Sequence, residues 1–100
     1  MIVVLSEMTR TPKTNADNGK DHWPSTSALL ISGDLAGGRT LGGTSEAGLE
    51  ALLTDLSTGA SMQTGNKMEF CNFAAGVLHA TGVDPAEYLQ DVEVLHGIVD

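Results

Sequence analysis

Residues 1–32 read MIVVLSEMTRTPKTNADNGKDHWPSTSALLIS, and this stretch decides which fold we expect. Its two ends are short apolar runs, MIVVLS at residues 1–6 and ALLIS at residues 28–32. Each run is continuous rather than alternating, which is typical of a strand that is buried on both faces, as in a parallel sheet. About twenty polar residues without periodicity separate the runs, and loops of this length are often functional. The stretch therefore predicts two buried strands joined by a functional loop.

Helices are expected in the second half of the chain. The clearest covers residues 69–81, where one apolar stripe has helical spacing: Phe70, Phe73, Ala74, Val77 and Leu78. Gly82 stands where a left-handed residue commonly ends a helix. The run DPAE at residues 84–87 is a capping box with proline at the first helical position, and it predicts a short helix through residue 89. Leucines at positions 49, 52, 53 and 56 predict another helix over residues 45–59.

The remaining segments are expected to be irregular or extended. Residues 33–48 contain six glycines, and residues 39–41 among them are expected to form a short strand in a hairpin-like excursion. The tail, residues 90–100, is expected to pack as an extended segment. The predicted fold class is α/β, with a few buried strands and flanking helices. One hundred residues make about one small domain.

Charge and composition exclude several classes of function. Five Lys and Arg stand against 13 Asp and Glu, and the formal net charge of -8 would repel nucleic acids and anionic membranes. Residues 1–40 sum to zero, so the whole excess lies in residues 41–100, either as a solvated acidic surface or as a docking face for a basic partner. The single cysteine excludes an internal disulfide and a CxxC metal motif. No apolar run approaches the roughly 20 residues that a membrane span needs.

The loop after the first strand carries the candidate site. Glu7 directly follows the first apolar run and His22 precedes the second, so both are expected at the edge of the sheet where α/β proteins bind ligands. A carboxylate and an imidazole suit zinc and similar divalent ions; alternatively, Asp21 caps a turn and His22 is an ordinary loop histidine. Arg10 and Lys13 are candidates to hold an anionic group, or else to form surface ion pairs with loop carboxylates.

Two motifs of this loop carry a resemblance to a known family. SEMTRTP at residues 6–12 and GKDHWP at residues 19–24, with Asn15 between them and a glycine-rich turn after the next strand, resemble the bacterial domain of unknown function 1501. FAAGVLHATGVDPAEYL at residues 73–89 is similar to the closing helix of that family. The family itself is similar to sulfatases and alkaline phosphatases. The resemblance covers nearly the whole chain and is weakest over residues 46–67.

This resemblance implies a fold and a site. The fold is the C-terminal portion of an alkaline-phosphatase-like core, so residues 1–100 are expected to form a single partial domain. Glu7 and His22 would bind a divalent metal, either zinc, calcium, magnesium or manganese. Arg10, Lys13 and Asp21 would bind or orient the anion of a phosphate or sulfate ester. The nucleophile of the superfamily lies in an N-terminal half that has no counterpart here, so the isolated chain is expected to be an inactive, hydrolase-like part.

Two residues depart from the superfamily pattern and support an alternative. Met8 stands where a metal-binding histidine is found, and Thr9 stands where a glycine is found. The alternative is a non-catalytic interaction domain, or a gene remnant, with a degenerate site. The expected partners are the missing N-terminal half or a second copy of the chain, because apolar surface left exposed favours association. The chain shows no signal peptide, although longer relatives are often exported.

Overall fold

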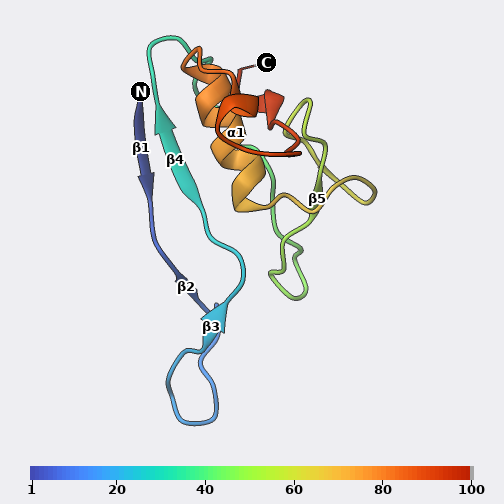
Figure 1. The fold of residues 1–100 in the computed structure, drawn as a ribbon. Coiled ribbons are helices and arrows are strands. Elements are labelled where there is room, and N and C mark those ends of the chain that lie inside the picture. The colour runs from blue at the N-terminus through green and yellow to red at the C-terminus, as the bar shows by residue number, and fades with distance from the viewer. Residues whose placement is uncertain (100) are drawn as a thin grey trace. The chain divides into compact units, whose positions relative to one another are not determined.

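Figure 1 shows the computed structural model of the chain, in which residues 1–99 are described. The chain divides into two compact units, Met1–Ser32 and Gly33–Asp100, called unit 1 and unit 2. Unit 1 contains four strands: β1 (Ile2–Leu5), β2 (Thr9–Arg10), β3 (His22–Trp23) and β4 (Ala28–Ile31). Unit 2 contains strands β5 (Leu53–Thr54) and β6 (Ser61–Met62), helix α1 (Phe70–Ala80) and the 3-10 turns η1 (Pro85–Glu87) and η2 (His96–Ile98).

Unit 1 is one long antiparallel hairpin. β1 pairs with β4 from Ile2 opposite Ile31 to Leu5 opposite Ala28, and β2 pairs with β3 farther along the same ribbon. Between the two ladders, residues 6–8 face residues 24–27, so the return segment carries one extra residue. Pro24 lies in that extra length and cannot donate a ladder hydrogen bond. As in a β-bulge, an extra residue bends the ribbon and separates the β2–β3 arm from the β1–β4 ladder.

The predicted strands form where expected, but they are neither parallel nor buried. β1 and β4 pair antiparallel in a sheet of two strands. Ile2, Val4 and Leu29 are 58%, 52% and 56% exposed, because a two-stranded ribbon has no further strands to enclose it. The region predicted to be a loop contains β2 and β3, each of two residues, which is too short for side-chain periodicity to reveal.

The core of unit 2 forms where the C-terminal segment packs against α1. Its buried apolar residues come from distant parts of the sequence: Leu56, Ala75, Leu95 and Ile98. A Cβ atom on Gly76 of α1 would lie 2.7 Å from the Cδ1 atom of Ile98 and 2.7 Å from the carbonyl oxygen of Leu95. Glycine at this position lets the segment touch the helix backbone. Gly97 makes a similar close approach to the backbone of residues 58–59.

Helix α1 begins and ends where the sequence predicts. At its start the backbone N–H of Glu69 donates to Oδ1 of Asn72 over 2.8 Å, within a reciprocal capping box. At its end Gly82 has a φ of 84°, and the backbone N–H of Val83 donates to the carbonyl oxygen of Leu78 over 2.9 Å. This second bond is the long-range bond of a Schellman motif, with glycine in the left-handed position.

The buried face of α1 is narrower than the predicted stripe. Ala75 and Gly76 are its buried residues, whereas Phe70 is 68% exposed. The difference follows from the close approach of the C-terminal segment, which selects the smallest side chains of the helix. Of the short helix predicted through residue 89, the cap is confirmed, because Asp84 accepts from the backbone N–H of Ala86 over 3.0 Å. The helix itself is only the 3-10 turn η1, which ends at Glu87.

The helix predicted over residues 45–59 does not form. The segment instead contains turns and β5, which pairs with β6. Ser45 Oγ accepts from the backbone N–H groups of Gly48 and Glu50, at 3.4 and 3.3 Å. The hydroxyl thus offers the backbone a local alternative to helical hydrogen bonds. Leu49 has a φ of 55°, outside helical space. Leu56 is buried in the core while Leu52 is 37% exposed, so the leucine spacing does not mark one helical face.

Two shorter expectations also differ from the structure. Residues 39–41 form no strand; instead the Arg39 side chain donates through Nη2 to the carbonyl oxygen of Ile98 over 2.8 Å. The tail is only partly extended, because η2 interrupts it at residues 96–98. This turn carries Ile98 into the core, where it is 2% exposed.

Gly76→Ala tests the close packing of α1. Alanine is the better helix former by about 1 kcal/mol, so propensity alone predicts stabilisation. Its methyl group would meet the Leu95 carbonyl oxygen, which is backbone and cannot rotate away. We expect a net loss of about 1–3 kcal/mol, measured by denaturant unfolding. Gly37→Ala is the control, because a Cβ there meets nothing within 4 Å; equal stability of both variants would contradict the packing account.

Candidate functional site

The tip of the β2–β3 arm is organised by Asn15. Its Oδ1 atom accepts from the backbone N–H groups of Asp17 and Gly19, both over 3.0 Å, and its Nδ2 atom donates to Oδ1 of Asp21 over 3.1 Å. Asn18 turns the chain with a φ of 60°, a conformation that asparagine adopts more readily than most residues. One side chain therefore closes the loop and fixes the Asp21 carboxylate. The sequence analysis assigned Asn15 no role; the available turn signal was the neighbouring pair Asn18-Gly19, because asparagine followed by glycine is common in turns.

Arg10 and His22 lie side by side on this arm. They are directly opposite each other in the β2–β3 ladder, so their side chains leave the same face, with Cβ atoms about 4.5–5.5 Å apart in such pairs. Both are exposed, and Arg10 Nη1 donates to the carbonyl oxygen of Lys20 over 3.4 Å. A guanidinium beside an imidazole presents several N–H donors to solvent, which suits an anion.

The structure brings together only part of the predicted site. Asp21 is the residue before His22, so it lies next to the Arg10–His22 pair on the side of the loop at the tip of the arm. Glu7 is exposed in the bend between β1 and β2, outside either ladder, and Lys13 is exposed on the loop, where its carbonyl oxygen accepts from Thr11 Oγ1 over 2.8 Å. Among residues 1–99 there is no group of three or more His, Cys, Asp or Glu that would hold a metal ion. The metal assignment of Glu7 and His22 therefore stays a prediction.

Thr9 differs chemically from its neighbours on the arm. It lies opposite Trp23, and its Oγ1 atom is buried without a hydrogen-bond partner among the described residues. A buried hydroxyl without a partner destabilises a fold by the cost of removing it from water. Thr9 is also the position at which the resemblance calls for glycine, so the departure in sequence has a structural consequence.

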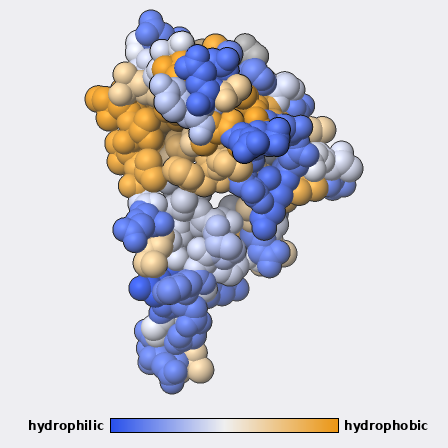
Figure 2. Space-filling model, in the orientation of Figure 1, coloured by the Kyte–Doolittle hydropathy of each residue, from blue (hydrophilic) through white to orange (hydrophobic). Residues whose placement is uncertain are grey.

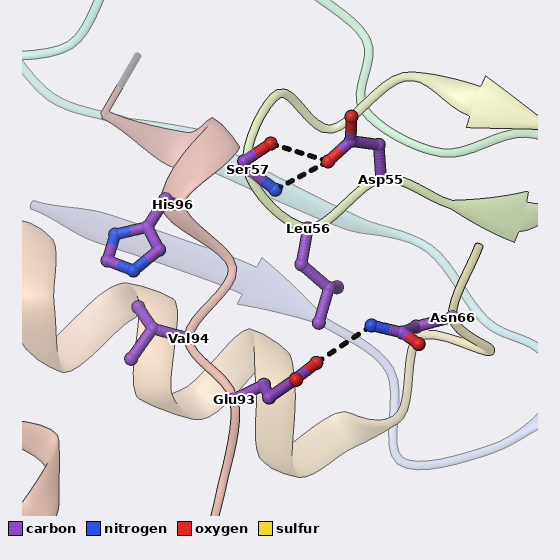
Figure 3. A pocket seen from close by; sticks show the side chains of 7 residues that line it. All are labelled: Asp55, Leu56, Ser57, Asn66, Glu93, Val94 and His96. Atoms are coloured by element: carbon purple, nitrogen blue, oxygen red, sulfur yellow. Dashed lines mark hydrogen bonds between the residues drawn. The ribbon is translucent and has the colours of Figure 1, made fainter.

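A concave region lies in unit 2 and was not anticipated from the sequence. It is a hollow of about 440 Å³ (Figure 3), and the residues that line it are Asp55, Leu56, Ser57, Asn66, Glu93, Val94 and His96. The Asp55 carboxylate accepts from the hydroxyl and the backbone N–H of Ser57, over 2.6 and 2.9 Å. Asn66 Nδ2 donates to Glu93 Oε2 over 2.7 Å. The Asp-x-Ser spacing, which favours such a turn, was the available signal.

The hydrogen bonds of this hollow change the acidity of Asp55. The hydroxyl of Ser57, and after it the backbone N–H of the same residue, stabilise the carboxylate and hold its pKa below the ordinary value of 3.8. The carboxylate therefore remains charged in mildly acidic solution. The side chain is half-buried and remains in contact with water, so these hydrogen bonds set its charge but add little to the strength of an ion pair there.

The chain can now be classed by these features. A polar arm stands between two apolar strands, and a capped helix follows later in the chain. The model of the family described as protein of unknown function (DUF1501) matches residues 1–95, and the chain belongs to this family. Neither the curated proteins nor the solved structures contain a match to it. Within residues 1–99, no helix has the length and apolar character to cross a membrane.

Ser57→Ala tests the cause of the Asp55 shift. Loss of the hydroxyl should raise the Asp55 pKa part of the way toward 3.8, because the backbone N–H of residue 57 remains as a donor. A lowered folded pKa stabilises the fold above the ordinary pKa, and this contribution disappears as pH falls through the folded pKa. An NMR titration of the Asp55 carboxyl measures the shift, with Ser61→Ala as control. An unchanged Asp55 pKa in Ser57→Ala would exclude this cause.

Proposed function

We propose that the chain is a non-catalytic interaction domain whose β1–β4 ribbon binds the ribbon of a second copy. The observation that carries this proposal is the exposure of large apolar side chains on unit 1. Among the described residues, thirteen large hydrophobic side chains are exposed, and seven of them lie in the first 32 residues: Met1, Ile2, Val4, Leu5, Met8, Leu29 and Ile31. Unit 1 is thus the more apolar surface although it is the smaller unit.

Four of these side chains share one face of the ribbon. Ile2 is paired with Ile31 and Val4 with Leu29, and each of the four is 50–58% exposed. Figure 2 shows a continuous hydrophobic surface over these strands. Contiguous apolar patches on a soluble protein commonly mark a surface that another molecule covers.

Charge favours a second copy as the occupant. Unit 1 holds three cations and three acids and is formally neutral, whereas unit 2 holds two cations against ten acids. Two copies that meet through unit 1 therefore bring neutral surfaces together, while contact through unit 2 would oppose like charges. Each strand of a two-stranded ribbon also keeps one open edge, and antiparallel pairing about a two-fold axis makes such an edge complementary to itself.

Val4→Lys tests this association. A charge in the middle of the ribbon face should convert a concentration-dependent dimer into a monomer, measured by light scattering after size-exclusion chromatography. Tyr88→Lys is the matched control, since Tyr88 is an exposed hydrophobic side chain of unit 2, at 72%; its dimer should persist. Helical circular dichroism from α1 checks that both variants are folded. A monomeric unaltered chain at high concentration, or a dimer that survives Val4→Lys, would overturn the proposal.

A second candidate function is the hydrolase-like one, and the Arg10–His22 pair favours it. The pair presents donors on one face of the arm, and Asn15 holds the Asp21 carboxylate close by along the chain. In this proposal Arg10, with Lys13 and Asp21, binds or orients the anion of a phosphate or sulfate ester. Glu7 and His22 are the proposed metal ligands, and further ligands and the nucleophile would come from a partner. The described residues alone do not make up a metal centre, so we derive no catalytic step through one.

Assays of the purified chain separate the two candidates. We expect no turnover of p-nitrophenyl phosphate or sulfate with zinc, calcium, magnesium or manganese, because no nucleophile matching the superfamily is present. The hydrolase-like candidate predicts phosphate or sulfate binding that weakens by about tenfold in Arg10→Ala, because a charge-assisted contact to the anion is lost. Lys67→Ala, a cation of unit 2, is the control. Anion binding that is equal in both variants would exclude the candidate, and clear turnover would overturn the expected inactivity.

A further inference from the structure

Two of the three histidines of the chain are brought together by unit 2. His79 lies in the last turn of α1, and His96 begins η2, seventeen positions later. Their ring centroids are 5.0 Å apart, and the ring planes cross at 83°. Neither residue was assigned a partner from the sequence, because the turn at Gly82 and the irregular tail between them give no periodic signal.

This separation matches that of two imidazoles that share one metal ion. A Zn–N bond of about 2.0–2.1 Å and a tetrahedral angle place two ring centroids roughly 5 Å apart. We propose that His79 and His96 form an exposed two-imidazole site for a borderline divalent ion, of which Zn²⁺ is the probe. No third His, Cys, Asp or Glu among residues 1–99 completes a ligand group, so water fills the remaining positions and binding is of moderate strength.

The backbone on both sides of the pair is well defined. The backbone N–H of His96 donates to the carbonyl oxygen of Val94 over 3.0 Å, and that of Val99 donates to His96 over 2.9 Å. Gly97, the next residue, donates to the carbonyl oxygen of Leu56 over 3.1 Å. The two Cα positions are therefore fixed by the helix and the core. Both side chains are exposed, so their rings are free to rotate a nitrogen atom toward an ion.

The surroundings of His96 attract cations. His96 lines the hollow that also contains the carboxylates of Asp55 and Glu93, and unit 2 carries all of the excess negative charge of the chain. Figure 3 shows the His96 ring turned toward α1, while the Asp55 carboxylate is turned to Ser57, which donates both of its hydrogen bonds in the hollow. The carboxylates thus raise the local cation concentration without ligating the ion themselves. Neutral imidazole nitrogen selects zinc, copper or nickel over calcium and magnesium, which prefer oxygen ligands.

A bound ion would join the end of α1 to η2. The C-terminal segment supplies Leu95 and Ile98 to the core, so an ion bound to His96 would stabilise the packing of the whole unit. Binding to the folded state alone raises the unfolding midpoint as the ion concentration increases. This inference is independent of the proposed function, because association uses unit 1 and the hydrolase-like candidate uses His22.

Calorimetric titration of the chain with Zn²⁺ tests the site. We expect about one equivalent of Zn²⁺ to bind per chain and to shift the NMR signals of both imidazoles. The unfolding midpoint should rise as the Zn²⁺ concentration increases. His79→Ala and His96→Ala should each weaken binding at least about tenfold. His22→Ala should retain it, because His22 lies in unit 1.

Three results would overturn the site, two from variants and one from a control ion. One is zinc binding of equal strength in the unaltered chain and in the variant that lacks both His79 and His96. The other is binding that His22→Ala abolishes while the other two variants retain it, which would support the hydrolase-like metal assignment instead. Ca²⁺ serves as the control ion, and binding of Ca²⁺ as tightly as Zn²⁺ would show that carboxylates rather than imidazoles hold the ion. Circular dichroism establishes that each variant is folded, as expected for exposed side chains.

Discussion

The close contact between α1 and the C-terminal segment is the constraint on which unit 2 depends. Gly76 removes the side chain that would keep them apart, and Asn72 joins them by hydrogen bonds. The Nδ2 atom of Asn72 donates to the backbone carbonyl oxygen of Glu93 over 2.9 Å. The backbone carbonyl oxygen of Asn72 accepts from the backbone N–H of Leu95 over 3.3 Å. The hollow and the histidine pair exist because this contact holds the residues after Glu93 beside the helix.

Unit 1 is built differently. Its apolar residues form the β1–β4 ribbon, and its polar residues form the β2–β3 arm. The β1–β4 ladder is hydrophobic and largely exposed, while the β2–β3 arm carries Arg10, His22 and the Asn15-bound Asp21. A two-stranded ribbon is marginally stable alone, so burial of its apolar face by another surface would also stabilise the arm. If both proposals hold, association through the ribbon would therefore favour ligand binding on the arm.

Features that depend on residues close together in the sequence were predicted well. Features that depend on contact with a distant segment were not. The ends of α1 follow from Glu69, Asn72 and Gly82, which act within a few residues of one another. The helix predicted over residues 45–59 was wrong. Leucine spacing does not reveal that the Ser45 hydroxyl accepts hydrogen bonds from the backbone N–H groups of Gly48 and Glu50. The five predicted site residues lie on one segment, yet the register alone shows that Arg10, rather than Glu7, faces His22.

By itself the sequence determined where the apolar strands and the capped helix lie, and its motifs indicated the DUF1501 family, to which the chain belongs. These features depend on residues that are near neighbours along the chain. Only the tertiary structure decided that the strands pair antiparallel and remain exposed, and that Gly76 meets Ile98. It also decided that His79 lies beside His96. The reason is physical: burial and contact between distant residues depend on how the chain returns upon itself.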